Sequence, residues 1–429
     1  MQPHPALRRA AAGTLSTALF LLFSILSGCR SNVNDPPMQG ILQSKQAFTL
    51  SMEAKFPVQQ VNLVANAASY NPKRTDDALL NAWGIAITPT GIIWIAANHS
   101  SLSVVYDTDG NVKRSPVTIP SHNSSTGGAP TGIVFNSTTD FVIPGTGAVS
   151  RFIFSSEDGI ISAWAPGAAG AVVVADRSDS GVVYKGLALA SDESHNFLYA
   201  TNFRGGTVDV FDDHFQFVTS KPFNDPSIPA GFAPFGIGNI HGKLYVTYAK
   251  QKPPGNVDDE SGPGNGYVDI YRPDGTLRKR FASQGTLNSP WGLARVPDEG
   301  FRNLEDAILV GNFGDGRINV FDEDGKFRGQ LSDGTSPITI DGLWALTFRE
   351  IPDEDREDDH GDNNSDEHER DLGDNDSSDH HQVQAQRLFF TAGPNEEIDG
   401  LFGYLVPLGS KEADRRDNHG SFLRLTNNR

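Results

Sequence analysis

The feature that most constrains this chain is a short apolar segment with a small residue near its start, which returns about every fifty residues. Its copies are Trp83–Ala86, Thr131–Val134, Lys185–Ala188, Phe235–Gly238, Trp291–Ala294 and, with alanine in place of glycine, Trp344–Thr347. Repeats of about this period are typical of propellers and solenoids, in which each unit buries its apolar surface against its neighbours. The repeat predicts a β-propeller.

Each repeat continues with further short segments that are rich in β-branched and aromatic residues. In the first repeat these are Ile92–Asn98 and Ser103–Tyr106, followed by Asp109-Gly110, a pair that supplies the positive φ angle of a tight hairpin. A strand after the hairpin would complete a four-stranded unit. We therefore expect an all-β fold, a six-bladed β-propeller with four-stranded blades over residues 56–410.

The last repeat ends near Val406, after its third strand. A blade that lacks its outer strand would expose an edge that can pair with other chains. We expect Val58–Val64, from the N-terminal side of the first repeat, to supply that strand and close the ring.

The composition narrows the fold class and the partners. The 429 residues include 44 glycines and 26 prolines, too many for a helical solenoid, and 38% are hydrophobic, enough for a sizeable core. The net charge of −18 argues against nucleic acid, whose phosphates require clustered lysine and arginine. Cations, neutral small molecules or a protein ligand are easier partners, and we expect a monomer.

The N-terminus predicts export. Arg8 and Arg9 give a basic start, Leu15–Leu26 is apolar, and small residues precede Cys29, the only cysteine in the chain. This arrangement resembles a bacterial lipoprotein signal, which implies removal of residues 1–28 and lipidation of Cys29. An ordinary secretory signal or a short membrane anchor, in which Cys29 is incidental, is the alternative.

Residues 29–55 have the polar and proline-containing composition of a flexible tether. The lipid anchor implies a place in the bacterial cell envelope. Arg30 stands where an inner-membrane retention signal would place aspartate, which favours the outer membrane, with the protein facing the periplasm or the exterior.

An acidic segment at about 352–383 interrupts the last repeat and contains almost no apolar residue. It cannot bury enough surface to offset its ordering entropy, so we expect a disordered insert. Its carboxylates and histidines could bind divalent ions loosely, although a solvated insert without a ligand explains the composition equally simply. Residues 411–429 form a polar C-terminal tail.

The residues just before each small residue form a first register of candidate site positions: Trp83, Thr131, Lys185, Phe235, Trp291 and Trp344. Side chains at equivalent positions of a propeller lie at one depth around its axis. Trp83, Lys185, Phe235, Trp291 and Trp344 could therefore bind a sugar or another flat ligand at the mouth of the channel. The same aromatic residues could instead be core between blades.

A second register ends the second strands at Asn98, Asn202 and Asn312. Asparagine oxygens around an axis, joined by Glu157, Asp341 or Glu396, are hard ligands suited to Ca²⁺. Asparagine also caps turns by bonding to its own backbone, and that alternative stays open.

Several runs resemble an uncharacterised family of exported bacterial proteins related to NHL-repeat propellers: Asn81–Ala86, Phe152–Gly159, Val183–Ala188, Ala230–Phe235, Leu244–Gln251, Gly311–Asn319 and Phe390–Pro394. The resemblance covers nearly all of Val61–Val406 and excludes the acidic insert. It implies the propeller fold and names no substrate.

More distantly, the chain is similar to six-bladed propellers of the gluconolactonase and regucalcin type. That resemblance implies lactone hydrolysis with an axial divalent metal, in which Asn202 and Asn312 match the amide ligands and Asp341 the carboxylate base. The glutamate that those enzymes carry near the start of their first blade is absent around Trp83.

Two hypotheses about function follow from these features. The first is a surface-tethered propeller that binds a ligand or protein partner at one face. The second is a divalent-metal-dependent hydrolase, with Asp341 activating water and the metal polarising the carbonyl. An assembly scaffold for envelope complexes is a third possibility, because propellers host many unrelated functions.

Overall fold

The structure, a computed structural model, describes residues 54–193, 195–297, 301, 304–349 and 387–410. All of these belong to one unit, Phe48–Arg429. The described residues form β-strands and three short 3-10 helices, and none of their helices is long and apolar enough to cross a membrane. The expected signal peptide, Cys29, the acidic insert and the C-terminal tail lie outside the described residues.

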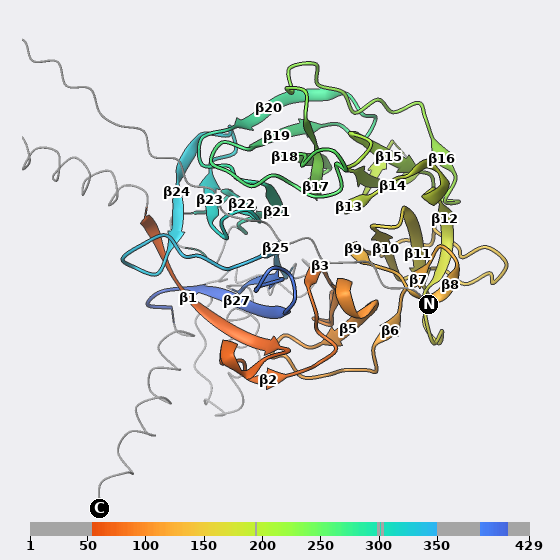
Figure 1. Cartoon of the computed structure of the whole chain (residues 1–429), viewed down its shortest axis with the longest axis horizontal. Helices are drawn as coiled ribbons and strands as arrows, with labels where there is room; N and C mark the ends of the chain where they lie inside the picture. The colour runs from red at the N-terminus through yellow and green to blue at the C-terminus, as the bar shows by residue number, and fades with distance from the viewer. Residues whose placement is uncertain (1–53, 194, 298–300, 302–303, 350–386, 411–429) are drawn as a thin grey trace, which may run out of the picture. The chain divides into compact units, whose positions relative to one another are not determined.

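Four-stranded antiparallel sheets repeat along the chain (Figure 1). Four of them are built from consecutive strands: β3 (Ala82–Ile87), β4 (Ile93–Ala97), β5 (Leu102–Tyr106) and β6 (Val117–Thr118); β9 (Pro130–Phe135), β10 (Phe152–Ser156), β11 (Ile160–Trp164) and β12 (Val172–Asp176); β13 (Tyr184–Asp192), β14 (His195–Asn202), β15 (Thr207–Phe211) and β16 (Phe217–Val218); β17 (Phe232–Ile240), β18 (Lys243–Lys250), β19 (Gly266–Tyr271) and β20 (Leu277–Ser283).

The N-terminal strand completes the last sheet. The remaining path runs through β21 (Pro290–Arg295), β22 (Ile308–Asn312), β23 (Ile318–Phe321), β24 (Phe327–Ser332), β1 (Ala54–Ala65), β27 (Leu401–Pro407), β26 (Leu388–Ala392) and β25 (Leu343–Phe348). β1 pairs antiparallel with β27 from Val58↔Pro407 to Ala65↔Leu401, as expected for Val58–Val64. Its first residues also run parallel to β24, so β1 joins the end of one sheet to the next.

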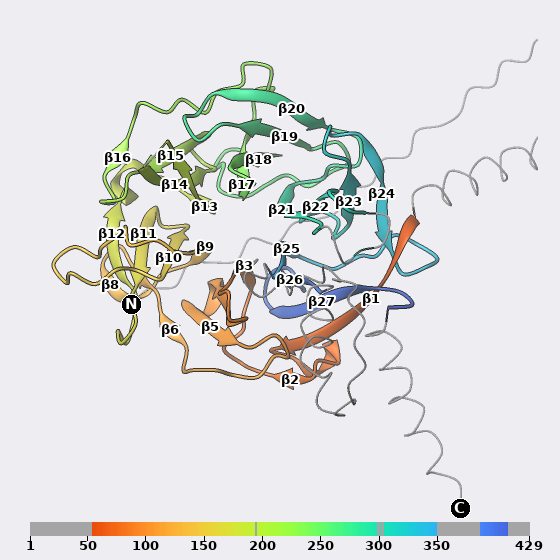
Figure 2. The ribbon, with the colours of Figure 1, turned by 180° about the vertical axis from the view of Figure 1, so that it is seen from behind.

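The first strands of the sheets follow one another around a closed circle. β3 contacts β9, and contacts continue through β13, β17, β21 and β25 back to β3. Figures 1 and 2 show these strands nearest the centre, with β12, β16, β20 and β24 at the periphery. Apolar clusters fill the spaces between neighbouring sheets. This arrangement is a β-propeller, as the repeat predicted.

The small residue of each repeat is explained by close backbone approach. A Cβ at Gly236 would lie 2.2 Å from the carbonyl oxygen of Trp291 on the next sheet, and one at Gly84 would lie 2.4 Å from that of Thr131. The pairing of the first two strands shifts register at the same place in each sheet, for example between Pro234 and Ile237. Glycine is therefore required by packing between sheets.

Buried hydroxyl groups on the second strands bind the backbone at this irregularity. Thr201 Oγ1 accepts a hydrogen bond from the Gly186 N–H at 2.7 Å and donates to the Phe235 carbonyl on the next sheet, also at 2.7 Å. Thr391 bridges the last sheet to the first in the same way. These hydroxyls link neighbouring sheets near the axis.

Candidate functional site

The aromatic residues of the first register meet at the propeller axis. The rings of Trp83 and Trp344 stack with centroids 3.5 Å apart, and Trp291 contacts both edge-on, at 6.2 and 5.9 Å. Phe235 lies 6.0 Å from Trp344. We call these four residues the axial cluster; its members come from β3, β17, β21 and β25.

The rings of the axial cluster fill the axis. Trp344 is covered on its other side by Phe313, stacked at 3.9 Å, and the Lys185 ammonium lies over Trp83, 4.9 Å from its ring centroid. Trp83, Phe235 and Trp344 are each only 1% exposed. The residues therefore face the axis, as the ligand-binding interpretation of the register requires. Their rings are also packed against one another as core, as the alternative interpretation requires.

A polar cavity of about 190 Å³ lies against the axial cluster. We call it the axial pocket. Trp83, Phe235 and Trp344 contribute apolar lining, and the polar lining consists of His99, Lys185 and five carboxylates, Glu157, Asp258, Asp259, Glu396 and Glu397. The site thus has an aromatic wall and a strongly acidic lining.

An ion pair links two of the residues that the sequence singled out. Lys185, whose side chain is 4% exposed, places Nζ 2.5 Å from Glu157 Oε1, and Asn98 Nδ2 donates to Glu157 Oε2 at 3.1 Å. Partial burial favours a higher pKa for Glu157, but the Lys185 ammonium and these hydrogen bonds outweigh it and hold the pKa below its ordinary value. Glu157 is therefore an ionised carboxylate at neutral pH.

A second carboxylate, Glu397, has the opposite electrostatic environment. Burial raises the pKa of Glu397, and the charge of Glu157 adds to the shift. Asn81 Nδ2 donates to Glu397 Oε2 at 2.7 Å, while Asn81 Oδ1 accepts the indole N–H of Trp344 at 3.0 Å. Asn81 therefore links this acidic group to the axial cluster.

Glu397 is presented by an unusual turn between β26 and β27. Asn395, Glu396 and Glu397 have φ angles of 59°, 54° and 65°, in the left-handed region that residues other than glycine rarely adopt. Asp341, the base expected from the lactonase resemblance, accepts the Asn395 N–H at 2.9 Å and so supports this turn. Backbone strain of this kind often accompanies functional sites.

Two asparagines of the second register use their side chains in structural hydrogen bonds, Asn202 within its own loop and Asn312 also to the segment before β21. Asn202 Oδ1 accepts the Gly205 N–H at 2.9 Å. Asn312 Oδ1 accepts the Asn288 N–H at 3.1 Å, and its amide donates to Asp315. Of the predicted metal ligands, Asn98 and Glu157 lie together, whereas Asn202 caps a turn and Asn312 links its loop to the segment before β21.

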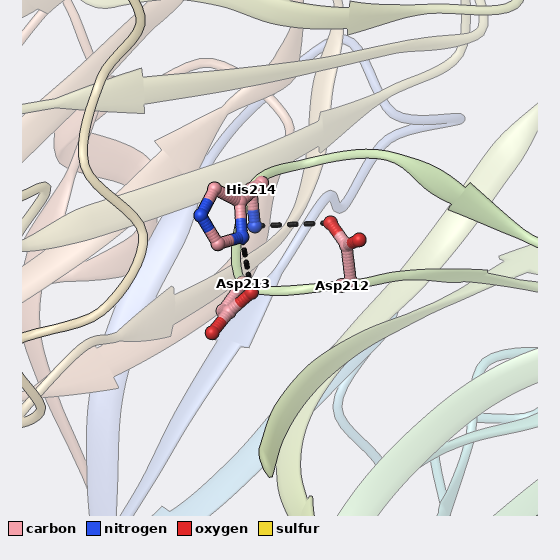
Figure 3. A group of neighbouring side chains, drawn as sticks. All are labelled: Asp212, Asp213 and His214. Atoms are coloured by element: carbon pink, nitrogen blue, oxygen red, sulfur yellow. Dashed lines mark hydrogen bonds and ion pairs between the residues drawn. The ribbon is translucent and has the colours of Figure 1, made fainter.

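Among the described residues, one group places three possible metal-ligand atoms within 4.8 Å of one another: Asp212, Asp213 and His214. Figure 3 shows this group on the loop after β15, with the His214 ring turned to Asp213 and its backbone N–H to Asp212. His214 has 81% of its side chain exposed. The hydrogen bonds within the group account for its geometry. The ligand atoms of the axial-pocket carboxylates lie farther apart than those of this group.

Sequence reasoning missed His99, Asp258, Asp259 and Glu397 as pocket residues. His99 lies in the short 3-10 helix Asn98–Ser100, and the other three lie on loops or turns, where the repeat gives no register. The available signals were the adjacency of His99 to Asn98 and of Glu397 to Glu396, since Asn98 and Glu396 are candidate metal ligands.

No protein-family model matches the chain. Two curated proteins of Acanthamoeba polyphaga mimivirus, uncharacterized proteins R648 and L690, are each 32% identical to it. The match to R648 covers 80% of this chain and 79% of R648, and the match to L690 covers 81% and 85%. The chain belongs to the family of R648 and L690. The relatives are viral, so the bacterial origin and export expected for this R648-family chain stay predictions.

The R648-family chain is also similar to solved structures of low sequence identity. One is titled as the structure of streptogramin B lyase, with 13% identity, a TM-score of 0.45, and coverage of 82% of this chain and 98% of that one. Another is described as a putative gluconolactonase, with 14% identity, a TM-score of 0.37, and coverage of 66% and 80%.

Proposed function

We propose that this chain is a six-bladed propeller that binds a small cationic ligand in the axial pocket. The observation that carries the proposal is the lining of that pocket, where five carboxylates converge and Lys185 is the one lysine among the residues described there. A cavity lined mostly by one sign of charge concentrates ligands of the opposite sign. Counting β1 with β25–β27 as the last blade supports the number six.

The size of the axial pocket favours a small molecule over a protein partner. A volume of 190 Å³ corresponds to about six water molecules. Drug-sized ligands occupy larger pockets, of about 300 Å³ or more. A ligand that fits is therefore a small organic cation or a hydrated metal ion.

The divalent-metal hydrolase is the second candidate. Glu157 and Glu397 favour it, because a pair of carboxyl groups whose environments shift their pKa values in opposite directions is the pattern of acid–base catalysis. In this version the metal would replace the organic cation among the same carboxylates. Turnover of a lactone together with Ca²⁺-dependent thermal stabilisation would favour the hydrolase over the binding protein.

We further propose that the propeller is anchored to a bacterial membrane through lipidated Cys29. The basic start, the apolar stretch and the single cysteine support this. Cells producing the full chain with radiolabelled palmitate should incorporate label, and Cys29→Ser should not. Unlabelled wild-type protein in the soluble fraction would overturn the anchor and leave the pocket proposal intact.

Isothermal titration of the full chain with ethylammonium chloride and with calcium chloride, at constant ionic strength, tests the binding function. We expect a saturable Kd in the millimolar range for at least one cation, and a loss of at least tenfold in the double variant Glu396→Gln/Glu397→Gln. Glu323→Gln/Asp324→Asn, which removes the same charge from an exposed turn, is the matched control. Equal binding by both double variants, or no binding of either cation, would overturn the function.

A further inference from the structure

We infer that the ligand of the axial pocket is a small amine that also carries hydroxyl groups, of the class of the amino sugars. The inference rests on the proposed function and adds the chemistry that selects one cation among many. It follows from the presence of hydrogen-bond donors within an otherwise acidic lining.

Lys185 supplies the first donor. Its ammonium carries three protons, and one of them is directed to Glu157 Oε1 at 2.5 Å. Although only 4% of the side chain is exposed, Lys185 lines the cavity. A ligand that offers only positive groups would meet a like charge here, whereas a hydroxyl oxygen would accept a hydrogen bond.

Trp83 supplies a second, unsatisfied donor. Its indole N–H is buried and has no hydrogen-bond partner among the residues that the structure describes, although Trp83 is only 1% exposed and lines the pocket. The other two tryptophans of the axial cluster donate to Lys185 O and to Asn81 Oδ1. A buried donor without a partner is unfavourable, so an acceptor that reaches it from the pocket gains affinity.

The acceptors of the pocket determine the charged group of the ligand. Asp258, Asp259, Glu396 and Glu397 line the same cavity and favour an ammonium group. They disfavour an amino acid, because its carboxylate would meet like charges. Among the described residues, no three of their ligand atoms lie within 4.8 Å of one another, which favours an organic ammonium group over a metal ion held by the carboxylates alone.

Ring stacking contributes little to this recognition. Trp344 lies between Trp83 and Phe313, and Lys185 covers the remaining face of Trp83. An apolar or aromatic amine therefore finds no open ring face on these two residues. Hydroxyl groups, which can use the donors of Lys185 and Trp83, are what should distinguish the ligand.

Three probes of similar size test this on the full chain: glucosamine, with amine and hydroxyls; cyclohexylamine, with the amine alone; and glucose, with the hydroxyls alone. Isothermal titration at pH 7 should give glucosamine at least tenfold tighter binding than either of the others. Trp83→Phe, which keeps a ring and removes the N–H, should weaken the binding of glucosamine about fivefold more than it weakens the binding of cyclohexylamine. Trp94→Phe, away from the pocket, is the control and should change neither.

The outcomes separate the two proposals. If glucosamine and cyclohexylamine bind equally, the hydroxyl requirement is wrong and the cation-binding function stands. Glucose binding as tightly as glucosamine would overturn both proposals, and so would the absence of binding by all cations. The ranking of probes on the unmodified protein decides the question even where Trp83→Phe fails to fold.

Discussion

The carbonyl oxygen of Trp291 lies so close to Gly236 that a Cβ on that glycine would be 2.2 Å away from it. This contact thus joins the small residue of one repeat, Gly236, to the first-register residue of the next repeat, Trp291. The Trp291 carbonyl oxygen is a backbone atom and the added Cβ would be bonded directly to the backbone. Neither sheet can therefore relieve the clash by moving a side chain. The requirement for glycine at position 236 and the position of the Trp291 backbone are therefore linked by one contact between neighbouring sheets.

Gly236→Ala should therefore destabilise the fold by about 3 kcal/mol, as overpacking against backbone does. Gly238→Ala, two residues along the same strand, is the matched control, because its Cβ would meet Leu293 at an ordinary 3.5 Å. Urea denaturation of both variants measures the difference. Equal midpoints would mean that the close approach of neighbouring sheets is not a packing constraint.

Thr201→Val should cost about 2 kcal/mol, since it leaves the buried Gly186 N–H and Phe235 carbonyl without their shared partner. Thr201→Ser keeps the hydroxyl and should recover most of that loss. The free energy of unfolding from urea denaturation is the readout. A serine variant as unstable as the valine variant would point to the lost methyl group instead.

Glu157→Gln should destabilise the fold at pH 7 by about 2 kcal/mol, because it leaves the buried ammonium of Lys185 without its countercharge. The folded-state pKa of Glu157 lies below the ordinary 4.5, so its stabilisation is present above pH 4.5 and is lost as the pH falls through the folded pKa. The difference in unfolding free energy between wild type and Glu157→Gln should therefore become smaller in acid.

The control for that variant is Glu260→Gln. Glu260 pairs with Lys250 at 2.7 Å, but their side chains are 46% and 38% exposed. An exposed pair contributes about 1 kcal/mol or less. Thermal melting of the two glutamine variants across pH 3–8 should separate them, and similar losses in both would show that Lys185 tolerates an unpaired charge.

Glu397→Gln should act in the opposite direction. The folded-state pKa of Glu397 is raised above the ordinary 4.5, so the wild type loses stability as the pH rises through the folded pKa. The neutral variant avoids this loss, while its amide oxygen can still accept from Asn81. Its melting temperature relative to wild type should therefore rise as the pH increases above the ordinary 4.5, and a constant difference would contradict the assigned shift.

Much of the fold could be predicted because the repeat fixes which backbone segments are equivalent. The first strands were predicted from Trp83, Trp291 and their counterparts, and the pairing of β1 with β27 followed from the missing edge of the last repeat. The parallel pairing of β1 with β24 could not be predicted, because it depends on the path that the first residues of β1 take between the last two sheets.

The site could be predicted only in part. Glu157, Lys185 and Asn98 occupy repeat positions and lie together, whereas Glu397 and Asp258 reach the pocket from irregular loops. Sequence could not place those loops because their positions follow from closure of the ring. It also left open whether Asn202 faces the axis or caps a turn, since the choice depends on a nearby backbone N–H.

The central claim, that a small cation binds at the propeller axis, is tested most directly by the indole N–H signals of the five tryptophans in ¹⁵N-labelled protein. Assigned by single Trp→Phe variants and followed during titration with glucosamine, the signals of Trp83 and Trp344 should shift saturably. Trp94 and Trp164, which stack near Phe152 outside the axial cluster, should not move. Saturable binding that leaves Trp83 and Trp344 unshifted would place the ligand elsewhere and contradict the account.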